Sequence, residues 1–206
     1  GSVSDGQGLN AVGLPLFGDV NHDGQLSDAE NQALNVTLNI AGDANTIAQE
    51  IGNVADLAQQ LHNSGIDYIN INGAASGSVT ITDLQAQELV SAGLAFSSGG
   101  GVLTDPTTHD HVNLAIDGTQ AAGTHLSTSL KDLQKLGVDT VLVAGATEAN
   151  PVGLTVDFGS VSDGQGLNAV GLPLFGDVNH DGVLRDAENQ ALNVTLNIAG
   201  DANTIA

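Results

Sequence analysis

Side chains that carry oxygen recur at a fixed spacing near the start of the chain. Asp19, Asn21 and Asp23 alternate with other residues, and Glu30 closes the segment as its twelfth residue. The first three place their oxygens on one side of a tight turn, and the terminal carboxylate can supply two more. Hard oxygen ligands in a flexible cage suit Ca²⁺ better than Mg²⁺ or a transition metal. The spacing therefore predicts a calcium-binding loop, with Ca²⁺ as the only cofactor.

Three further positions of this loop fit the same chemistry. Gly24 allows the backbone conformation that the turn requires. We expect Gln25 to contribute its backbone carbonyl and Ser27 to bind the ion directly or through water. The loop is thus expected to supply every ligand from one short stretch of chain.

A second copy of the loop follows 158 residues later. Its predicted ligands are Asp177, Asn179, Asp181, Val183 and Glu188. Val183 replaces Gln25 without loss, because only the carbonyl of that position is used. Arg185 replaces Ser27, cannot bind a cation and places positive charge beside it. We therefore expect weaker calcium binding in the second copy.

The phrase Gly-Asp-Val-Asn-His-Asp-Gly, followed by a short acidic helix over Ser27–Ala33, resembles a dockerin-type or EF-hand-like calcium loop. A complete EF-hand would have a helix before the loop, whereas residues 14–17 predict an extended segment. A dockerin would also carry two loops within one small domain. Docking onto a cohesin is therefore not implied.

The chain is organised as a long tandem repeat. Residues 159–206 reproduce residues 1–48 at every position except the two substitutions above. Residues 1–158 are thus predicted to be one complete repeat, made of a calcium-loop junction segment over 1–48 and a helix and strand body over 49–158. Residues 159–206 begin the next repeat.

Charge excludes several classes of partner. The 24 acidic residues face only Lys131, Lys135 and Arg185, which gives a formal net charge of −21. Nucleic acid binding needs many more Lys or Arg side chains on phosphates. No segment approaches the ~20 consecutive apolar residues that span a bilayer, so we expect no membrane insertion. Repulsion among the carboxylates should loosen the chain unless cations neutralise it.

The body repeats one local pattern: a short helix, a glycine that ends it and an alternating strand. The glycines are Gly65, Gly93 and Gly137, each expected in a left-handed conformation. Asp67 and Asp139 follow two of them and are interpreted as structural turn residues. Helix starts are predicted from a capping box formed by Thr82 and Gln85, and from Ser127 or Ser129 before the third helix.

Apolar periodicity predicts a mixed α/β fold of βαβ-type units, stacked in an elongated array. Residues with a period of two predict strands near 34–40, 69–71, 79–81, 112–116, 141–143 and 154–158. A helical face from Ile47 to Leu61 is expected to bend at Gly52. Helical crossovers imply parallel strands, and short joins such as residues 73–77 imply hairpins, so we expect a mixed sheet.

Other residues could do different chemistry. His109-Asp110-His111 could bind a transition metal, but no third ligand is evident, which favours a polar loop. Asp105-Pro106 could be a calcium-triggered self-cleaving bond, although a turn accounts for it without chemistry. His125 and Ser127 are close in sequence but do not form a catalytic triad pattern. We therefore do not expect an enzyme.

In composition the whole chain is similar to giant bacterial adhesins and matrix proteins exported by type I secretion: acidic, without Cys and rich in Gly and Asp. The glycine-rich nonapeptide of that class is missing. The resemblance implies a secreted, extracellular repeat at the cell surface or in the matrix, with neighbouring repeats or other copies of itself as partners, in an adhesin stalk or self-assembling filament. The alternative is a module that binds carbohydrate or protein, although carbohydrate recognition favours aromatic platforms and Tyr68 is almost alone.

Overall fold

The computed structural model describes residues 16–27, 29–30, 34, 36–41, 44–72, 78–96, 111–117, 124–159, 173–179 and 183–199. These residues form two compact units. The first unit comprises residues 1–79 and 88–110, and the second comprises residues 80–87 and 111–206. The mixed α/β class predicted from the sequence is confirmed.

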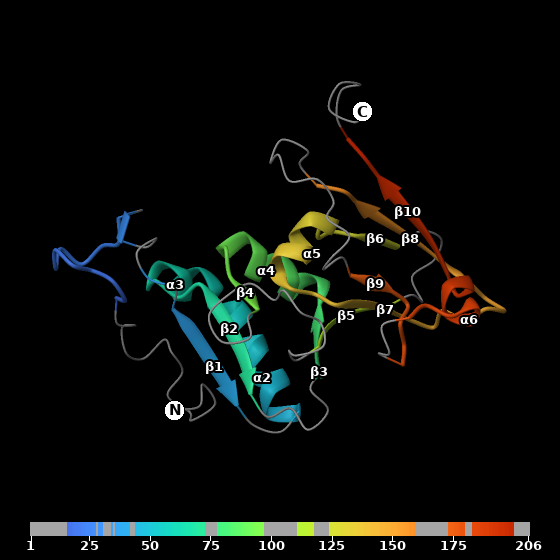
Figure 1. Ribbon diagram of the computed structural model, residues 1–206, viewed down its shortest axis with the longest axis horizontal. Helices are drawn as coiled ribbons and strands as arrows, with labels where there is room; N and C mark the ends of the chain where they lie inside the picture. Colours follow the sequence, from blue (N-terminus) through green and yellow to red (C-terminus); the bar gives the residue numbers. More distant parts are fainter. Residues whose placement is uncertain are drawn as a thin grey trace. The chain divides into compact units, whose positions relative to one another are not determined.

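A parallel sheet and two helices make up most of the first unit (Figure 1). The sheet has the order β1-β2-β4, with bounds Thr37–Ala41, Tyr68–Asn72 and Ala95–Phe96. Helix α2 (Ala44–Asp56) contacts β1, and α3 (Ala58–Asn63) precedes β2. Ile40, Ile47 and Ile51 are buried in this unit and belong to its apolar core.

Two parallel sheets characterise the second unit. One has the order β3-β5-β7-β9, with bounds Ser78–Thr82, His111–Asp117, Thr140–Ala144 and Leu174–Phe175. The other has the order β10-β8-β6, with bounds Leu192–Asn197, Val152–Asp157 and Thr124–Leu126. From β5 to β10 the chain alternates between these two sheets, with helix α5 (Leu130–Leu136) between β6 and β7 and helix α6 (Asp186–Gln190) between β9 and β10. Helix α4 (Asp83–Ala92) contributes residues to both units.

The expectation of antiparallel neighbours is wrong for the strand pairs whose register the structure describes. All six pairings with a described register are parallel, and the only antiparallel contact among the described residues is the isolated bridge between Thr147 and Asn150. Residues 73–77 lie outside the described residues. The strands on either side of them, β2 and β3, belong to different sheets and therefore do not form a hairpin.

The local helix signals are mostly confirmed. Gly65, Gly93 and Gly137 have φ angles of 87°, 80° and 89°. Thr82 and Gln85 form the predicted capping box, with the Thr82 N–H 3.0 Å from Gln85 Oε1 and the Gln85 N–H 3.2 Å from Thr82 Oγ1. Of the two serines considered for α5, Ser129 is the N-cap.

The predicted bend at Gly52 is wrong, because α2 runs through this residue and the break falls at Leu57. Ala55 and Ala58 on either side of the break are both buried. A single glycine lowers helix propensity by about 1 kcal/mol, an amount that burial of apolar side chains on the same helix exceeds.

Asp67 and Asp139 are structural, as their positions after Gly65 and Gly137 indicate. The Asp67 N–H donates to the Val36 carbonyl at 3.0 Å, and the Val36 N–H donates to Asp67 Oδ2 at 2.9 Å. The same reciprocal pair joins Asp139 and Val112, at 2.8 and 2.7 Å. Each aspartate therefore fixes the register at the start of a pair of parallel strands.

No helix in the described part of the chain is long and apolar enough to cross a membrane.

The two sequence copies place one isoleucine in different surroundings, which predicts different costs of truncation. Ile40 is 1% exposed, whereas its counterpart Ile198 is 47% exposed. We expect Ile40→Ala to lower the free energy of unfolding by about 2–5 kcal/mol, because it removes buried methyl groups and leaves a cavity. Ile198→Ala should change it by no more than about 0.5 kcal/mol. Urea denaturation of the two variants measures both values, and equal costs would contradict the assigned surroundings.

Candidate functional site

The first predicted calcium loop, residues 19–30, is folded by hydrogen bonds to its own acidic and amide side chains. Asp19 accepts hydrogen bonds from the Asp23 N–H at 3.2 Å and from the Gly24 N–H at 3.0 Å. Asn21 Oδ1 accepts from the Asp23 N–H at 2.8 Å, and Asp23 Oδ1 accepts from the Gln25 N–H at 2.9 Å. Overlapping turns of this kind bring the side-chain oxygens of alternate residues to the inside of the loop.

Glu30, the last residue of the loop, reaches back across it. Its Oε1 atom accepts from the Val20 N–H at 3.1 Å and from the Asn21 N–H at 3.4 Å. Its Oε2 atom accepts from the Ser27 N–H at 3.0 Å and from the Ser27 hydroxyl at 2.7 Å. The two ends of the loop are thus tied together by one carboxylate.

These bonds lower the pKa of Glu30 below its ordinary value of 4.5. The largest cause is the Ser27 backbone N–H, followed by the Ser27 hydroxyl; the Asn21 and Val20 N–H groups add to it, while partial desolvation opposes it. Hydrogen bonds to the ionised form favour that form. Glu30 therefore remains a carboxylate, the form that can bind a cation, to a lower pH than an ordinary glutamate.

Backbone conformation matches the tight turn predicted from Gly24. Gly24 has φ of 78°, and no atom lies within 4 Å of the position that a Cβ would take there. His22 also has a positive φ, 59°, which is uncommon for a residue with a side chain. The conformational requirement at Gly24 is confirmed, and the one at His22 was missed.

The loop is anchored to the turn between α3 and β2. The Phe17 N–H donates to the Ser64 carbonyl at 2.9 Å. A Cβ added to Gly65 would lie 2.6 Å from the Phe17 carbonyl oxygen and 3.1 Å from Leu26 Cδ1. Gly65 therefore has two roles, because its lack of a side chain allows the left-handed helix end and also lets both sides of the loop pack against it.

The second loop lies between two strands of different sheets, after β9 and before β10. The predicted extended segment before the loop is confirmed here by β9, and the predicted short acidic helix by α6. The Arg185 N–H donates to Glu188 Oε2 at 3.0 Å, which matches the Ser27 N–H bond of the first copy. Asp177 is 1% exposed, and a carboxylate at this burial requires compensation by hydrogen bonds or a cation. Asp181 lies outside the described residues.

The glycine before each loop is held in the same way in both copies. Gly18 has φ of 97° and Gly176 has φ of 93°. A Cβ on either residue would lie 3.2 Å from the carbonyl oxygen of the closing glutamate, Glu30 or Glu188. The two copies therefore share the close contact between the start and the end of the loop.

The donor set fits calcium by chemistry, but the described carboxylates do not converge as they stand. Among the described residues, no three His, Asp or Glu side chains lie close enough together to hold a metal. The carboxylates of Asp19, Asp23 and Glu30 are bonded to loop N–H groups, and each retains lone pairs that can face an ion. With the Asn21 amide oxygen, the Ser27 hydroxyl and the Gln25 carbonyl, these residues would hold Ca²⁺.

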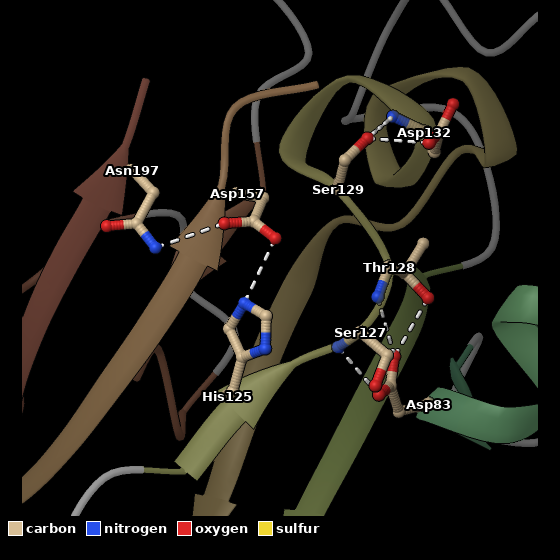
Figure 2. Close-up of polar contacts among 8 residues, drawn as sticks. All are labelled: Asp83, His125, Ser127, Thr128, Ser129, Asp132, Asp157 and Asn197. Carbon is tan, nitrogen blue, oxygen red and sulfur yellow. Dashed lines mark hydrogen bonds and ion pairs between the residues drawn. The ribbon is translucent and has the colours of Figure 1, made fainter. Parts of the chain in front are cut away.

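His125 and Ser127 make separate contacts (Figure 2). His125 Nε2 lies 3.0 Å from Asp157 Oδ2, while the Ser127 N–H donates to Asp83 Oδ2 at 2.9 Å. Asp83 also accepts from Thr128. Both contacts lie within the second unit and join neighbouring elements. Asp105-Pro106 and His109-Asp110 lie outside the described residues, and only the backbone of His111 is described.

Sequence reasoning missed the residues that hold the loop in place. Phe17 precedes the loop and Leu26 lies within it, and neither carried a signal beyond being apolar. Gly65 was recognised only as a helix end, since its second contact comes from a distant part of the chain.

No match to this chain is found among protein-family models, curated proteins or solved structures.

Replacing the anchoring glycine should destabilise the loop more than replacing a glycine of the same conformation elsewhere. Gly93→Ala is the matched control, since its φ is also positive and its Cβ would meet only His62, at 3.6 Å. We expect Gly93→Ala to cost about 1–2 kcal/mol for the left-handed backbone alone. Gly65→Ala should cost more and should speed amide exchange at Phe17. Urea denaturation and hydrogen exchange test this, and equal effects of the two variants would refute the anchoring role.

The lowered pKa of Glu30 predicts how the ion-free loop responds to acid. A carboxylate with a depressed folded-state pKa contributes stability that is complete above the unfolded value and is lost as the pH falls through the folded value. Ser27→Ala removes the hydroxyl donor, so we expect Glu30 to titrate at a higher pH, nearer 4.5. Ser27→Thr keeps the hydroxyl and should preserve the lower pKa. Carboxyl carbon shifts of Glu30, followed by NMR against pH, give the result; identical titration of both variants contradicts the assignment.

Proposed function

We propose that this chain is part of a calcium-stabilised structural repeat of a secreted bacterial surface or extracellular-matrix protein, used in an adhesin stalk or a self-assembling filament. The observation that carries the proposal is the loop over residues 19–30: its carboxylates accept hydrogen bonds from its own N–H groups, and Glu30 joins its two ends. The loop recurs after 158 residues in a chain with very few cationic side chains.

Electrostatics support a divalent ion as the stabilising partner. Only three Lys and Arg residues are available to 24 acidic ones. Each loop gathers several carboxylates within twelve residues, so repulsion between them opposes the turn that brings them together. A bound Ca²⁺ would reverse the sign of this local interaction. Binding at 100 times the dissociation constant would stabilise the folded state by about 2.7 kcal/mol per site.

The position of the second loop supports a mechanical role for the ion. The loop connects β9 in one sheet of the second unit to β10 in the other sheet. An ion held by the loop would fix its length and direction, and would therefore restrain the two strands that it joins. We assign the chain no catalytic role, because this site orders a connection between strands.

Calcium titration tests the proposal directly. By calorimetry we expect the loop over residues 19–30 to bind Ca²⁺ with a dissociation constant on the order of 10⁻⁴–10⁻³ M. Glu30→Gln should remove this binding and the associated rise in melting temperature. Glu148→Gln, which removes a charge outside both loops, is the control and should leave binding unchanged. Absence of binding heat at millimolar Ca²⁺, with a melting temperature indifferent to EDTA, would reject the proposal.

The second loop offers a natural variant of the first. Arg185 stands where the first copy has Ser27. We expect Arg185→Ser to strengthen calcium binding in the second loop several-fold, because it removes a positive charge and restores a hydroxyl ligand. Ser27→Arg should weaken the first loop to a similar extent. Calorimetry of the two reciprocal variants checks the prediction, and an unchanged affinity in both contradicts the role assigned to this position.

A further inference from the structure

The near-identical segments over residues 16–41 and 174–199, here called the connector, bond to different neighbours. We infer that a connector between two repeats holds the repeat before it and the repeat after it at the same time. In the second copy the connector follows a complete repeat, and in the first copy it precedes the body of one. Each copy therefore shows one half of the contacts that an internal connector would make.

The second copy shows the contacts with the preceding repeat. Strand β9 pairs with β7, through the Leu174 N–H to the Asp139 carbonyl at 2.8 Å and the Gly176 N–H to the Val141 carbonyl at 3.0 Å. Strand β10 pairs with β8 in parallel. At the ends of this ladder, the carbonyls of Ala191 and Asn197 accept from the N–H groups of Val152 and Phe158, at 3.0 and 2.8 Å.

The first copy shows the contacts with the following body. The Phe17 N–H donates to the Ser64 carbonyl at 2.9 Å, and Val36 makes the reciprocal pair with Asp67. The Val36 carbonyl also accepts from the Tyr68 N–H at 3.1 Å. From Thr37 onwards β1 pairs with β2 in parallel, and this ladder covers Thr37, Leu38 and Asn39. Their counterparts in the second copy, residues 195–197, pair with β8 instead.

The two sets of bonds use different backbone groups. The preceding repeat is bonded through residues 174, 176, 191 and 197 of the second copy. The following body is bonded through Phe17 and Val36 of the first copy, which correspond to residues 175 and 194 of the second. Within each strand, the residues used for one neighbour alternate with those used for the other. Successive residues of a strand direct their N–H and C=O groups to opposite edges, so one strand can bond both neighbours without competition.

The side chain of Asn197 and that of its counterpart Asn39 also bond different neighbours through different atoms. Asn197 donates from Nδ2 to Asp157 Oδ1 at 3.1 Å, which extends the contact between Asp157 and His125 across three strands (Figure 2). Its counterpart Asn39 accepts at Oδ1 from Asn70 Nδ2 at 2.8 Å. The contact to the preceding repeat uses the amide nitrogen and the contact to the following body uses the amide oxygen. An asparagine side chain can make both bonds together.

Exposed apolar side chains of the second copy indicate which partner would cover them. Val194, Leu196 and Ile198 are 42%, 41% and 47% exposed and alternate along one face. In the first copy Ile40, the counterpart of Ile198, is buried, and α2 contacts β1. The matching occupant is therefore a further copy of the body, with a helix of the α2 sequence and a strand of the β2 sequence. In such an array the sheet β6-β8-β10 would continue into β2 and β4 of the next repeat.

This inference rests on the array in the proposed function but not on its calcium. The test extends the chain after Ala206 with the sequence of residues 49–110, which continues the repeat because residues 199–206 match residues 41–48. Amide exchange is followed by NMR in the original and extended chains. We expect exchange at Val194 and Leu196 to slow at least ~10-fold on extension, as their N–H groups gain acceptors. Thr195 and Asn197 should retain the protection that they have beside β8.

Two variants make the test specific. Asp67→Ala in the added copy removes the acceptor for the Val194 N–H, so exchange at Val194 should return towards its original rate while Leu196 stays protected. Ile198→Ala should change the unfolding equilibrium constant less than ~3-fold in the original chain and at least ~30-fold in the extended one, in line with the cost of truncating a buried isoleucine. Equal effects of Ile198→Ala in the two chains would overturn the inference.

The outcomes separate this inference from the proposed function. Unchanged exchange at Val194 and Leu196 on extension, or loss of protection at Thr195 and Asn197, shows that the connector serves one neighbour only and overturns the inference. Measurement in Ca²⁺ and in EGTA gives an independent result. If extension protects the amides in both conditions but Ca²⁺ does not bind, the shared strand stands and the calcium role fails. If Ca²⁺ binds but extension does not protect the amides, the calcium role stands and the shared strand fails.

Discussion

The hydrogen bond from a backbone N–H to a carboxylate is the interaction on which this structure depends. A chain with 24 acidic residues and three Lys or Arg cannot neutralise its carboxylates by ion pairs within itself. Asp19, Asp67, Asp83 and Asp139 accept backbone N–H groups instead. Such bonds replace part of the hydration that folding removes. The acidic residues thus set turns and strand registers.

The loop over residues 19–30 has several examples of the same interaction within twelve residues. At Asp67 a single carboxylate aligns two strands, whereas in the loop Asp19, Asp23 and Glu30 each bind N–H groups of one short segment. Bringing charges of one sign together raises the free energy of the folded loop, and hydrogen bonds offset only part of this. The remainder is what a divalent cation would relieve. A loop that is already turned by its own N–H groups needs less ordering when the ion binds, which favours affinity.

Local rules predicted the parts of this fold that local chemistry decides. The left-handed glycines, the capping box at Thr82 and the turn role of Asp67 each depend on residues within a few positions of one another. Parallel strands were expected from the helical crossovers, but the choice of strand partners and the division into several sheets could not be predicted, since alternating strands give the same pattern for any choice of partner. Likewise Gly65 carries a helix-end signal in sequence, while its contact with Phe17 depends on how the loop folds back. The predicted ligand set follows from spacing alone, and the bonds that orient it require the folded loop.

The two copies of the connector bond different neighbours through different residues. A strand has two edges, and each residue serves only one of them. Val36 of the first copy bonds the body that follows it, whereas Ala191 and Asn197 of the second copy bond the body that precedes them, so the two neighbours are bonded through different positions of the same sequence. Ile198 is exposed in the second copy, whereas its counterpart Ile40 is buried in the first. The connector therefore needs no special sequence at a junction, which is the condition that a tandem array of near-identical units imposes on its boundaries.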